Sequence, residues 1–229
     1  MKPVGGVAVL CDFDGTLTSR NVMDFLYQRF AACGMTYAEQ WEHGEISTPE
    51  EMRLTFATVH ASRQEMETEL AGLEVDPGLP ELVGFCQERG YPLGVVSDGL
   101  EWYIRFLLQL HGAADLPVYA NRLLFGRSGF RLEFPWYDKE TPKRGVCKPK
   151  IVRSFRESGF KVAFVGDGLS DVDAVTEADR VYARAGLLAH CRAQGIPAIA
   201  FGSLSDLVRR WQDPAPSSSS PRGQAMSTC

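Results

Sequence analysis

Two aspartates separated by a single residue, Asp12 and Asp14, follow a short apolar run near the start of the sequence. At the end of a strand, side chains two residues apart leave on the same side, so both carboxylates would face one site while Phe13 points into the core. Neighbouring carboxylates stay ionised together only beside a cation or strong hydrogen-bond donors. The pair therefore predicts either a bound divalent metal, for which oxygen ligands favour magnesium, or a raised pKa on one aspartate. Taken alone, the pattern, with Gly15 next in sequence, also fits an ordinary turn.

A second pair of carboxylates, Asp167 and Asp171, lies in the motif GDGLSD that follows another apolar run. Asp171 would stand at the start of a helix predicted over residues 172–177, and a role as a helix cap would explain it. That role gives no reason for Asp167. Because a strand-loop-helix junction of this kind opens at the same edge of a parallel sheet as the end of the first strand, we expect the two pairs to meet.

Ser97 and Lys148 could supply hydrogen bonds and positive charge to an anion at the same edge. Ser97 ends a third apolar run and is followed by Asp98 and Gly99, and Lys148 precedes a helix predicted to begin near Pro149. Each has a simpler interpretation by itself, as a turn serine and as a solvated surface lysine. Their order along the chain, between the two aspartate pairs, is the informative feature.

The elements that would position these side chains alternate between strands and helices. Continuous apolar runs are typical of strands that are buried on both faces of a parallel sheet. Alternation with helices of about ten residues predicts right-handed crossovers and an α/β fold with a doubly wound parallel sheet. The predicted strands are residues 7–11, 92–96 and 162–165, with weaker candidates at 180–183 and 198–201, and the clearest helices are 79–89 and 151–157.

Two stretches interrupt the alternation. Residues 21–76 contain no strand-like run and predict a small helical cap inserted after the first strand, with helices at 22–32, 51–59 and 63–73. Residues 119–135 alternate around two glycines and predict an antiparallel hairpin. We therefore predict a catalytic core of residues 1–20 and 77–213, a helical cap of residues 21–76, and a disordered Ser/Pro-rich tail at 214–229.

The composition of the chain indicates which kinds of partner it binds and in which compartment it works. The chain has 229 residues, a net charge of -5 and no long Lys/Arg run, which predicts no binding of nucleic acid or of an anionic membrane. No segment approaches the roughly 18 apolar residues of a membrane span, and the N-terminus leads into a strand instead of a secretory leader. The six scattered cysteines lack zinc spacing and are interpreted as reduced, mostly buried thiols. We expect small-molecule chemistry in the cytoplasm, by a monomer or a homodimer.

The order of the motifs resembles the haloacid dehalogenase superfamily of phosphatases: DFDGT at 12–16, then a serine after an apolar run, then a lysine, then GDGLSD. The resemblance extends to about Trp211. It implies that Asp12 is the nucleophile that attacks phosphorus and becomes a transient aspartyl phosphate. Asp14 would protonate the leaving alcohol and then activate water. Phosphoryl transfer depends mostly on positioning and positive charge, which agrees with these roles.

The resemblance also implies a Mg2+ cofactor. A cation is needed because an anionic carboxylate can approach an anionic phosphate only when their repulsion is screened. The metal would be held by the carboxylates of Asp12 and Asp167 and the backbone carbonyl of Asp14, with Asp171 assisting directly or through water. The substrate would be a small phosphorylated metabolite, and its phosphate would be bound by Ser97, Asp98, Gly99 and Lys148.

A helical insertion directly after the first motif resembles the cap of the phosphoserine phosphatase branch of this superfamily, where a small helical module closes over the substrate. Five further stretches narrow the resemblance: residues 11–16, 44–47, 134–136, 147–149 and 164–171. They resemble the methionine-salvage phosphatases of that branch, which act on 2-hydroxy-3-keto-5-methylthiopentenyl 1-phosphate. The chain departs from them at Asp98, where glycine is expected, and in having the single Cys147 where more cysteines often occur.

Other substrates and protein classes stay open. Phosphoserine phosphatases place a glutamate where this chain has Asn21, with Asp24 close by, and Arg53 could serve as their cap arginine. A phosphotransferase would use the same catalytic residues, and a non-catalytic binding protein could keep the fold. A dehalogenase would lack Asp14, and a phosphorylated receiver domain would need only about half this length.

The predicted cap begins with three apolar side chains, Met23, Phe25 and Tyr27. Their character suits a methylthio group of a substrate. The same pattern also fits the core-facing side of a helix.

Overall fold

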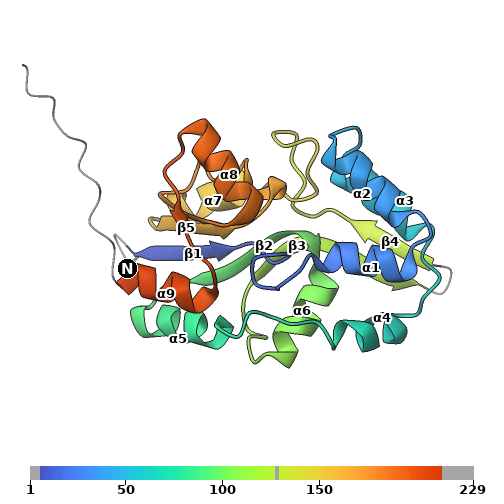
Figure 1. Cartoon of the computed structure of the whole chain (residues 1–229), viewed down its shortest axis with the longest axis horizontal. Helices are drawn as coiled ribbons and strands as arrows, with labels where there is room; N and C mark the ends of the chain where they lie inside the picture. Colours follow the sequence, from blue (N-terminus) through green and yellow to red (C-terminus); the bar gives the residue numbers. More distant parts are fainter. Residues whose placement is uncertain (1–5, 127–128, 213–229) are drawn as a thin grey trace, which may run out of the picture.

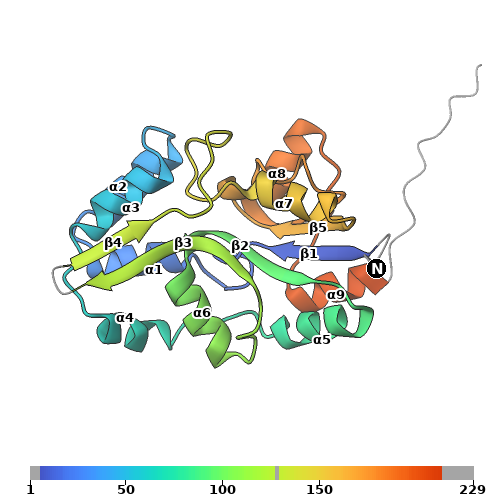
Figure 2. The same ribbon diagram turned by 180° about the vertical axis from the view of Figure 1, so that it is seen from behind.

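The computed structural model describes residues 6–126 and 129–212. Within these ranges seven strands form one sheet in the order β4-β3-β2-β1-β5-β6-β7, and each neighbouring pair is parallel except the β3–β4 hairpin. Helices pack on both faces (Figures 1 and 2), which confirms the predicted α/β fold with a doubly wound parallel sheet. The strands are β1 (Val7–Cys11), β2 (Leu93–Leu100), β3 (Val118–Gly126), β4 (Gly129–Glu133), β5 (Lys161–Gly166), β6 (Arg180–Ala183) and β7 (Ile199–Ala200).

Different helices cover the two faces of the sheet. Side chains of β1 alternate between two cores, since Val9 and Cys11 belong to one apolar cluster and Leu10 to the other. Burial on both faces explains the continuous apolar runs in the sequence. One face is covered by α5 (Leu79–Arg89), α6 (Glu101–Leu110) and α9 (Leu204–Gln212), and the other by α7 (Lys148–Glu157) and α8 (Ala185–Gln194) (Figure 1).

The helical insertion predicted after the first strand is present. Thr18 and Val75 form an antiparallel bridge, so the chain leaves and re-enters the core at one place. Ser47 caps the third helix, which therefore starts earlier than predicted. The insertion packs beside the β3–β4 hairpin (Figure 2), where the rings of Phe56 and Phe130 lie 5.7 Å apart. Its helices are α1 (Val22–Phe30), α2 (Gly34–Glu42), α3 (Thr48–Phe56) and α4 (Arg63–Leu70).

The carboxyl ends of β1, β2 and β5 lie at one edge of the sheet. Cys11, the last residue of β1, pairs in register with Val95 of β2 and with Val165 of β5. The backbone N–H of Asp12 donates to the carbonyl of Val165 at 2.8 Å. Residues that follow these positions therefore converge, as the parallel arrangement predicts.

The second of these strands is longer than predicted. β2 continues through Ser97, Asp98 and Gly99 to Leu100, and its pairing register with β3 is broken between Val96 and Leu100. The three polar residues thus belong to an irregular end of the strand and not to a loop after it. Such an irregularity turns side chains out of the regular alternation of a strand.

The helix predicted over residues 172–177 is wrong. A single-turn 3-10 helix, η1 (Leu169–Asp171), is followed there by turns. The backbone N–H of Ala174 donates to the carbonyl of Asp171 at 3.0 Å, an i to i+3 contact of the 3-10 type. Valine, threonine and aspartate in this segment have low helix propensity, so the single turn is not extended.

The structure tests some of the remaining predictions, on membrane spans and cysteines, but not those on the tail and the division between core and cap. The described helices include none with the length and apolar character that crossing a bilayer requires. The five cysteines in the described ranges are free thiols, and four of them are buried, in agreement with the interpretation from sequence. The predicted disordered tail at 214–229 lies outside the described residues. The division between core and cap at residues 20 and 76 stays a prediction.

Candidate active site

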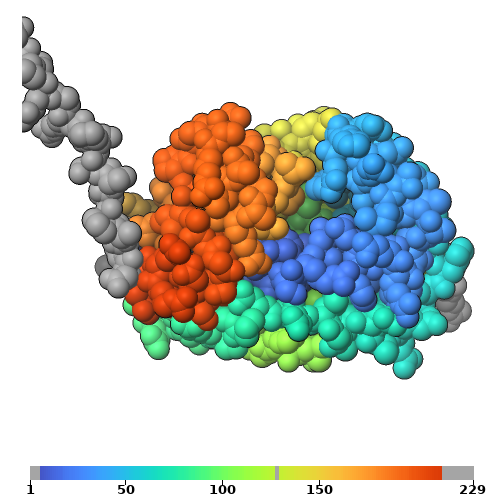
Figure 3. All heavy atoms as spheres, viewed as in Figure 1, coloured from blue at the N-terminus to red at the C-terminus, as the bar shows by residue number. Residues whose placement is uncertain are grey.

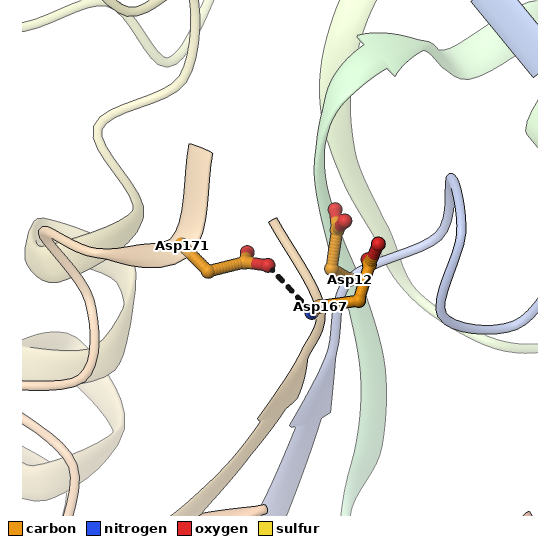
Figure 4. Close-up of side chains that lie close together, drawn as sticks. All are labelled: Asp12, Asp167 and Asp171. Carbon is orange, nitrogen blue, oxygen red and sulfur yellow. Dashed lines mark hydrogen bonds between the residues drawn. The ribbon is translucent and has the colours of Figure 1, made fainter. Parts of the chain in front are cut away.

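Three carboxylates meet at the edge where β1 and β5 end. Asp12 follows β1, Asp167 follows β5, and Asp171 lies at the end of η1 (Figure 4). One oxygen from each lies within 4.8 Å of the others, and Asp12 and Asp171 are buried. Asp171 also holds the loop closed, because its Oδ2 accepts hydrogen bonds from the backbone N–H groups of Asp167 at 3.0 Å and Gly168 at 3.1 Å. The two predicted aspartate pairs therefore converge through Asp12, Asp167 and Asp171.

Lys148 lies against this cluster. Its Nζ is 2.8 Å from Oδ1 of Asp12, 2.7 Å from Oδ1 of Asp171 and 3.1 Å from the hydroxyl of Ser170. The residue is only 1% exposed, so the interpretation as a solvated surface lysine is wrong. Burial opposes its charge, but the carboxylates of Asp12 and Asp171 outweigh burial and raise the pKa of Lys148 above its ordinary value. A permanent positive charge is thus held inside the site.

The cluster carries more negative charge than Lys148 can balance. Burial raises the pKa of Asp12 well above its ordinary value, the charge of Asp171 raises it further, and Lys148 opposes both. Burial likewise raises the pKa of Asp167, against a hydrogen bond from the Thr16 hydroxyl at 2.7 Å. Crowded, desolvated carboxylates favour a bound cation, and ligands that are all oxygen suit Mg2+. The residues therefore fit the predicted metal.

Gly15 allows these groups to approach one another. Its φ of +77° lies in the left-handed region, which glycine adopts without strain. A side chain at this position would also collide with the carboxylate of Asp167. Glycine in the DFDGT motif is therefore required both by the turn and by the neighbouring carboxylate of Asp167.

Asp14 is not part of this cluster of three carboxylates. Its carboxylate accepts hydrogen bonds from the backbone N–H of Val22 at 2.8 Å and from the hydroxyl of Tyr103. Burial raises the pKa of Asp14 to about 6, while the hydrogen bonds from Tyr103 and Val22 act in the opposite direction. The carboxyl group can thus exchange a proton near neutral pH, as an acid and base must. Its predicted metal contact through the backbone carbonyl stays a prediction.

Ser97 and Gly99 border the site in different ways. Ser97 is buried, and its hydroxyl accepts a hydrogen bond from the backbone N–H of Gly99 at 3.0 Å. A side chain at position 99 would occupy the space of the Tyr103 hydroxyl and crowd the carboxylate of Asp14. Gly99 is therefore required for the contact between Tyr103 and Asp14. Phosphate binding by Ser97 and Gly99 stays a prediction.

Asp98 uses both oxygens of its side chain in hydrogen bonds within the protein, and phosphate binding by this residue stays a prediction. Its Oδ1 accepts hydrogen bonds from the backbone N–H groups of Gly145 at 2.9 Å and Val146 at 2.8 Å, and its Oδ2 accepts one from the hydroxyl of Thr48 at 3.1 Å. Through these contacts Asp98 joins β2 to the segment before α7 and to the first residue of α3.

Two residues that the sequence did not single out support the site. Arg184 donates from Nε to the carbonyl of Gly15 at 2.9 Å and from its guanidinium to the carbonyls of Thr16 and Thr18, which fixes the loop after β1. Tyr103 holds Asp14. Arg184 has no recognisable motif around it. The position of Tyr103 four residues after Gly99 was the available signal, although an aromatic residue in an apolar helix is usually part of a core.

A cavity of about 220 Å3 connects the carboxylates with the cap. The surface is hollowed between α2 and α3, in blue, and the orange C-terminal part of the core (Figure 3). Asp12, Asp14 and Asp167 lie at the cavity, and the cap residues that line it include Met23, Tyr27, Trp41, Glu51 and Met52. A cavity of this size accepts a small molecule whose reacting group faces the aspartates.

The fold and the site define a phosphatase: a buried aspartate beside the ammonium group of a buried lysine, a second carboxyl with a raised pKa, and a cluster of three carboxylates at the edge of a parallel sheet. Residues 9–176 match the model of the haloacid dehalogenase-like hydrolase family, and the chain belongs to that family. The resemblance inferred from the motifs is thereby confirmed.

Relatives of known name point the same way. The chain is 28% identical over 210 residues to the 2-hydroxy-3-keto-5-methylthiopentenyl-1-phosphate phosphatase of Brevibacillus brevis, covering 89% of this chain and 94% of the relative. It is 30% identical over 218 residues to the bifunctional enzyme MtnB/MtnX of Bacillus licheniformis, and this match covers 90% of the chain but 49% of the relative. The chain thus spans about half the length of that bifunctional protein.

Solved structures share the fold. The phosphoserine phosphatase from T. onnurineus superposes with a TM-score of 0.69 at 19% identity, covering 93% of this chain and 98% of that one. A HAD family hydrolase from Salmonella enterica superposes with a TM-score of 0.73 at 14% identity, covering 94% and 74%. At such identities the similarity concerns the fold alone.

Proposed function

We propose that this phosphatase is a Mg2+-dependent phosphomonoester hydrolase that works through an aspartyl phosphate on Asp12. The observation that supports the proposal best is the contact of Asp12 with Lys148, at 2.8 Å, beside a cavity that leads to the cap. Lys148 holds one carboxylate oxygen of Asp12 and adds the positive charge that lets an anionic nucleophile approach phosphate. Ser97, a buried residue of the cavity wall, would donate a hydrogen bond from its hydroxyl to a phosphoryl oxygen.

The reaction takes place in two steps, first transfer of the phosphoryl group to Asp12 and then its transfer to water. Asp12 forms a bond to phosphorus while the bond from phosphorus to the ester oxygen breaks, and the leaving oxygen takes a proton from Asp14. In the second step Asp14 takes a proton from water, whose oxygen displaces the aspartate and releases inorganic phosphate. Tyr103 and the N–H of Val22 hold Asp14 in place for both transfers.

The metal would be held by Asp12, Asp167 and the backbone carbonyl of Asp14, with Asp171 assisting. When bound, Mg2+ supplies charge that offsets the negative phosphoryl oxygens. Lys148 and Asp171 contribute by fixing the carboxylates in position, since both are buried and hydrogen-bonded to their neighbours.

Removal of the metal tests the cofactor. Hydrolysis of p-nitrophenyl phosphate should fall at least about 100-fold in EDTA and return when Mg2+ is added in excess. Mg2+ should also raise the melting temperature of the resting protein, because a ligand that binds only the folded state stabilises it. The Asp167→Asn variant should show a smaller thermal shift, whereas Asp115→Asn, at an exposed position, should match the wild type. Equal turnover in EDTA would exclude the proposed cofactor.

The same assay separates hydrolysis from phosphotransfer, the alternative with the same catalytic residues. A hydrolase releases one inorganic phosphate for each nitrophenol, whether or not a second alcohol is present. A phosphotransferase would release less phosphate than nitrophenol when glycerol or another alcohol acceptor is added.

For the substrate we propose a methylthio-pentenyl phosphate of methionine salvage, as in the relatives named above. The cap side of the cavity supports this, because Met23, Met52 and Trp41 offer apolar surface to a methylthio group. Phosphoserine is the second candidate. Its binding gains no support from Arg53, which is exposed and lies over the ring of Phe134 at 4.9 Å. A panel of methylthio-pentenyl, amino-acid and sugar phosphates tests the choice, and a wide preference for phosphoserine would contradict it.

The contact between Tyr103 and Asp14 predicts a change in pH dependence. The hydrogen bond from Tyr103 favours the ionised carboxylate, so Tyr103→Phe should raise the pKa of Asp14 above about 6. Asp14 must be protonated in the first step, and the alkaline limb of the kcat profile should therefore move to higher pH. The shift should be clear with an alkyl phosphate, whose leaving group needs the proton, and weaker with p-nitrophenyl phosphate. Tyr137→Phe, at an exposed position, is the control, and an unmoved limb would argue against the assignment of Asp14.

A further inference from the structure

The cap places a buried carboxyl group, Glu51 of α3, in the wall of the cavity. Glu51 is 5% exposed, and its Oε2 accepts a hydrogen bond from the hydroxyl of Tyr27 at 3.0 Å. Its other oxygen, Oε1, is buried and has no hydrogen-bond partner among the described residues. Buried polar atoms in folded proteins almost always have a partner. An unpartnered oxygen on a residue that lines a ligand cavity therefore indicates that the ligand supplies one.

The charges around Glu51 are all of one sign. Asp24 on α1 and Asp98 on β2 are the charged groups close enough to act on it, and both raise its pKa. Burial is the larger cause, and together they raise the pKa of Glu51 to about 8 despite the hydrogen bond from Tyr27. Among the described residues that line the cavity, none is lysine, arginine or histidine. The cap side of the cavity thus offers no cation to a second anionic group on a substrate.

The chemistry that fits such a wall is an uncharged oxygen. A carboxyl group that is mostly protonated near neutral pH can donate a hydrogen bond to a carbonyl and can accept one from a hydroxyl. The thioethers of Met23 and Met52 in the same cavity make the entrance of a second charge unfavourable, because it would lose its hydration without gaining a partner.

We infer that Glu51 is a specificity-determining residue that hydrogen-bonds a hydroxyl or carbonyl group of the substrate and excludes phosphomonoesters that carry a carboxylate. The inference rests on the proposed function, since it assigns the contacts of the substrate body at the same site. The inference also makes the proposed function more specific, because it defines the substrate class by one chemical property: apart from its phosphate, the substrate is not anionic.

Two three-carbon phosphates test this directly. Glycerol 3-phosphate and 3-phosphoglycerate differ in that one ends in a hydroxymethyl group and the other in a carboxylate. Their inhibition constants are measured in competition with p-nitrophenyl phosphate on the Mg2+-loaded enzyme. At about pH 9, above the pKa of about 8 at which Glu51 ionises, wild-type protein should bind glycerol 3-phosphate about 100-fold more tightly, as a site with a repulsive element against one ligand does. In Glu51→Gln the ratio should fall to about 10 or less, because the amide keeps the shape but can no longer become anionic.

Both inhibition constants are measured on the same protein sample, so a loss of folded protein does not change their ratio. Glu50→Gln, the exposed neighbour on the same helix, is the matched control and should keep the wild-type ratio. The wild-type ratio should also grow as pH rises through about 8, where Glu51 ionises, and should stay level in Glu51→Gln. A purely structural role of Glu51 would give no such difference.

The possible failures are distinguishable. If the wild type does not hydrolyse p-nitrophenyl phosphate, the proposed function fails, and the two ligands are then compared by titration calorimetry on the same protein with Mg2+. A ratio near one in either measurement overturns the inference. So does a ratio that Glu51→Gln leaves unchanged, or a marked preference for phosphoethanolamine over glycerol 3-phosphate, which would show that the wall selects a cation.

Discussion

Asp12→Asn should reduce the hydrolysis of p-nitrophenyl phosphate by about 1000-fold or more, because an amide lacks the anionic oxygen that attacks phosphorus. The loss should appear in kcat and not only in KM. The fold should be retained, since the amide oxygen can still accept the hydrogen bond that Lys148 donates to Oδ1 of Asp12. The measurements are steady-state release of nitrophenol and a thermal melt of the same sample.

The intermediate gives this prediction a second readout. Acid quenching of the wild type during turnover should trap a protein whose mass has increased by one phosphoryl group, located on the peptide that contains Asp12. The variant should show none. Asp115→Asn makes the same chemical change at an exposed position and should behave like the wild type in both assays. An Asp12→Asn enzyme with more than about a tenth of the wild-type rate would remove Asp12 as the nucleophile.

Much of the framework could be predicted because buried parallel strands leave a strong pattern. β1 has the bounds of the apolar run at 7–11, β6 those of the weaker candidate at 180–183, and α5 those of the helix predicted over 79–89. Knowing that strands end at one edge was enough to expect that Asp12, Asp167 and Asp171 would meet. The chemical roles of these aspartates were predicted from the family resemblance, because the arrangement of strands alone does not assign them.

The side chains that support the site were harder to predict, since their partners are distant in sequence. Tyr103 and Asp14 are 89 residues apart, and Arg184 reaches a carbonyl 169 residues away. Before the fold is known, Tyr103 and Arg184 can be interpreted only from their neighbours in sequence, as an aromatic residue in an apolar helix and an arginine at the end of a strand. Long-range hydrogen bonds of this kind carry no periodicity that a sequence could display.

Asp98 and Lys148 show how burial alters an interpretation. A polar triplet after an apolar run suggests a binding loop, but the irregular end of β2 turns the carboxylate of Asp98 toward the backbone of Gly145 and Val146. A lone lysine suggests the surface, but Lys148 begins α7 and its side chain is buried against two aspartates. In both cases the deciding contact comes from a segment that only the tertiary structure brings near.

Lys148 is the residue whose removal should affect both stability and activity. Lys148→Met keeps an unbranched side chain, one atom shorter than that of lysine, but leaves Asp12 and Asp171 without their shared cation. Removing one partner of a buried ion pair costs about 3 to 5 kcal/mol, and the loss should be seen as a lower free energy of unfolding in urea without metal. Turnover should fall at least about 100-fold, because the positive charge that meets the phosphoryl oxygens is absent. Lys150→Met removes an exposed lysine two residues along and should change neither quantity appreciably.

The loss of stability in Lys148→Met should depend on pH and on Mg2+ if Lys148 acts through its charge, and on neither if it acts only through packing. The folded-state pKa values of Asp12 and Asp167 are raised by burial, so the folded protein binds more protons than the unfolded chain between the two sets of values. Stability from these groups is present at low pH and is lost as pH rises through the folded pKa. Without Lys148, which lowers the pKa of Asp12, this decline should continue to higher pH. Mg2+ should recover part of the stability of Lys148→Met, since it offsets the same negative charge, but not the turnover. A loss that is independent of pH and of Mg2+ would show that Lys148 acts through packing alone.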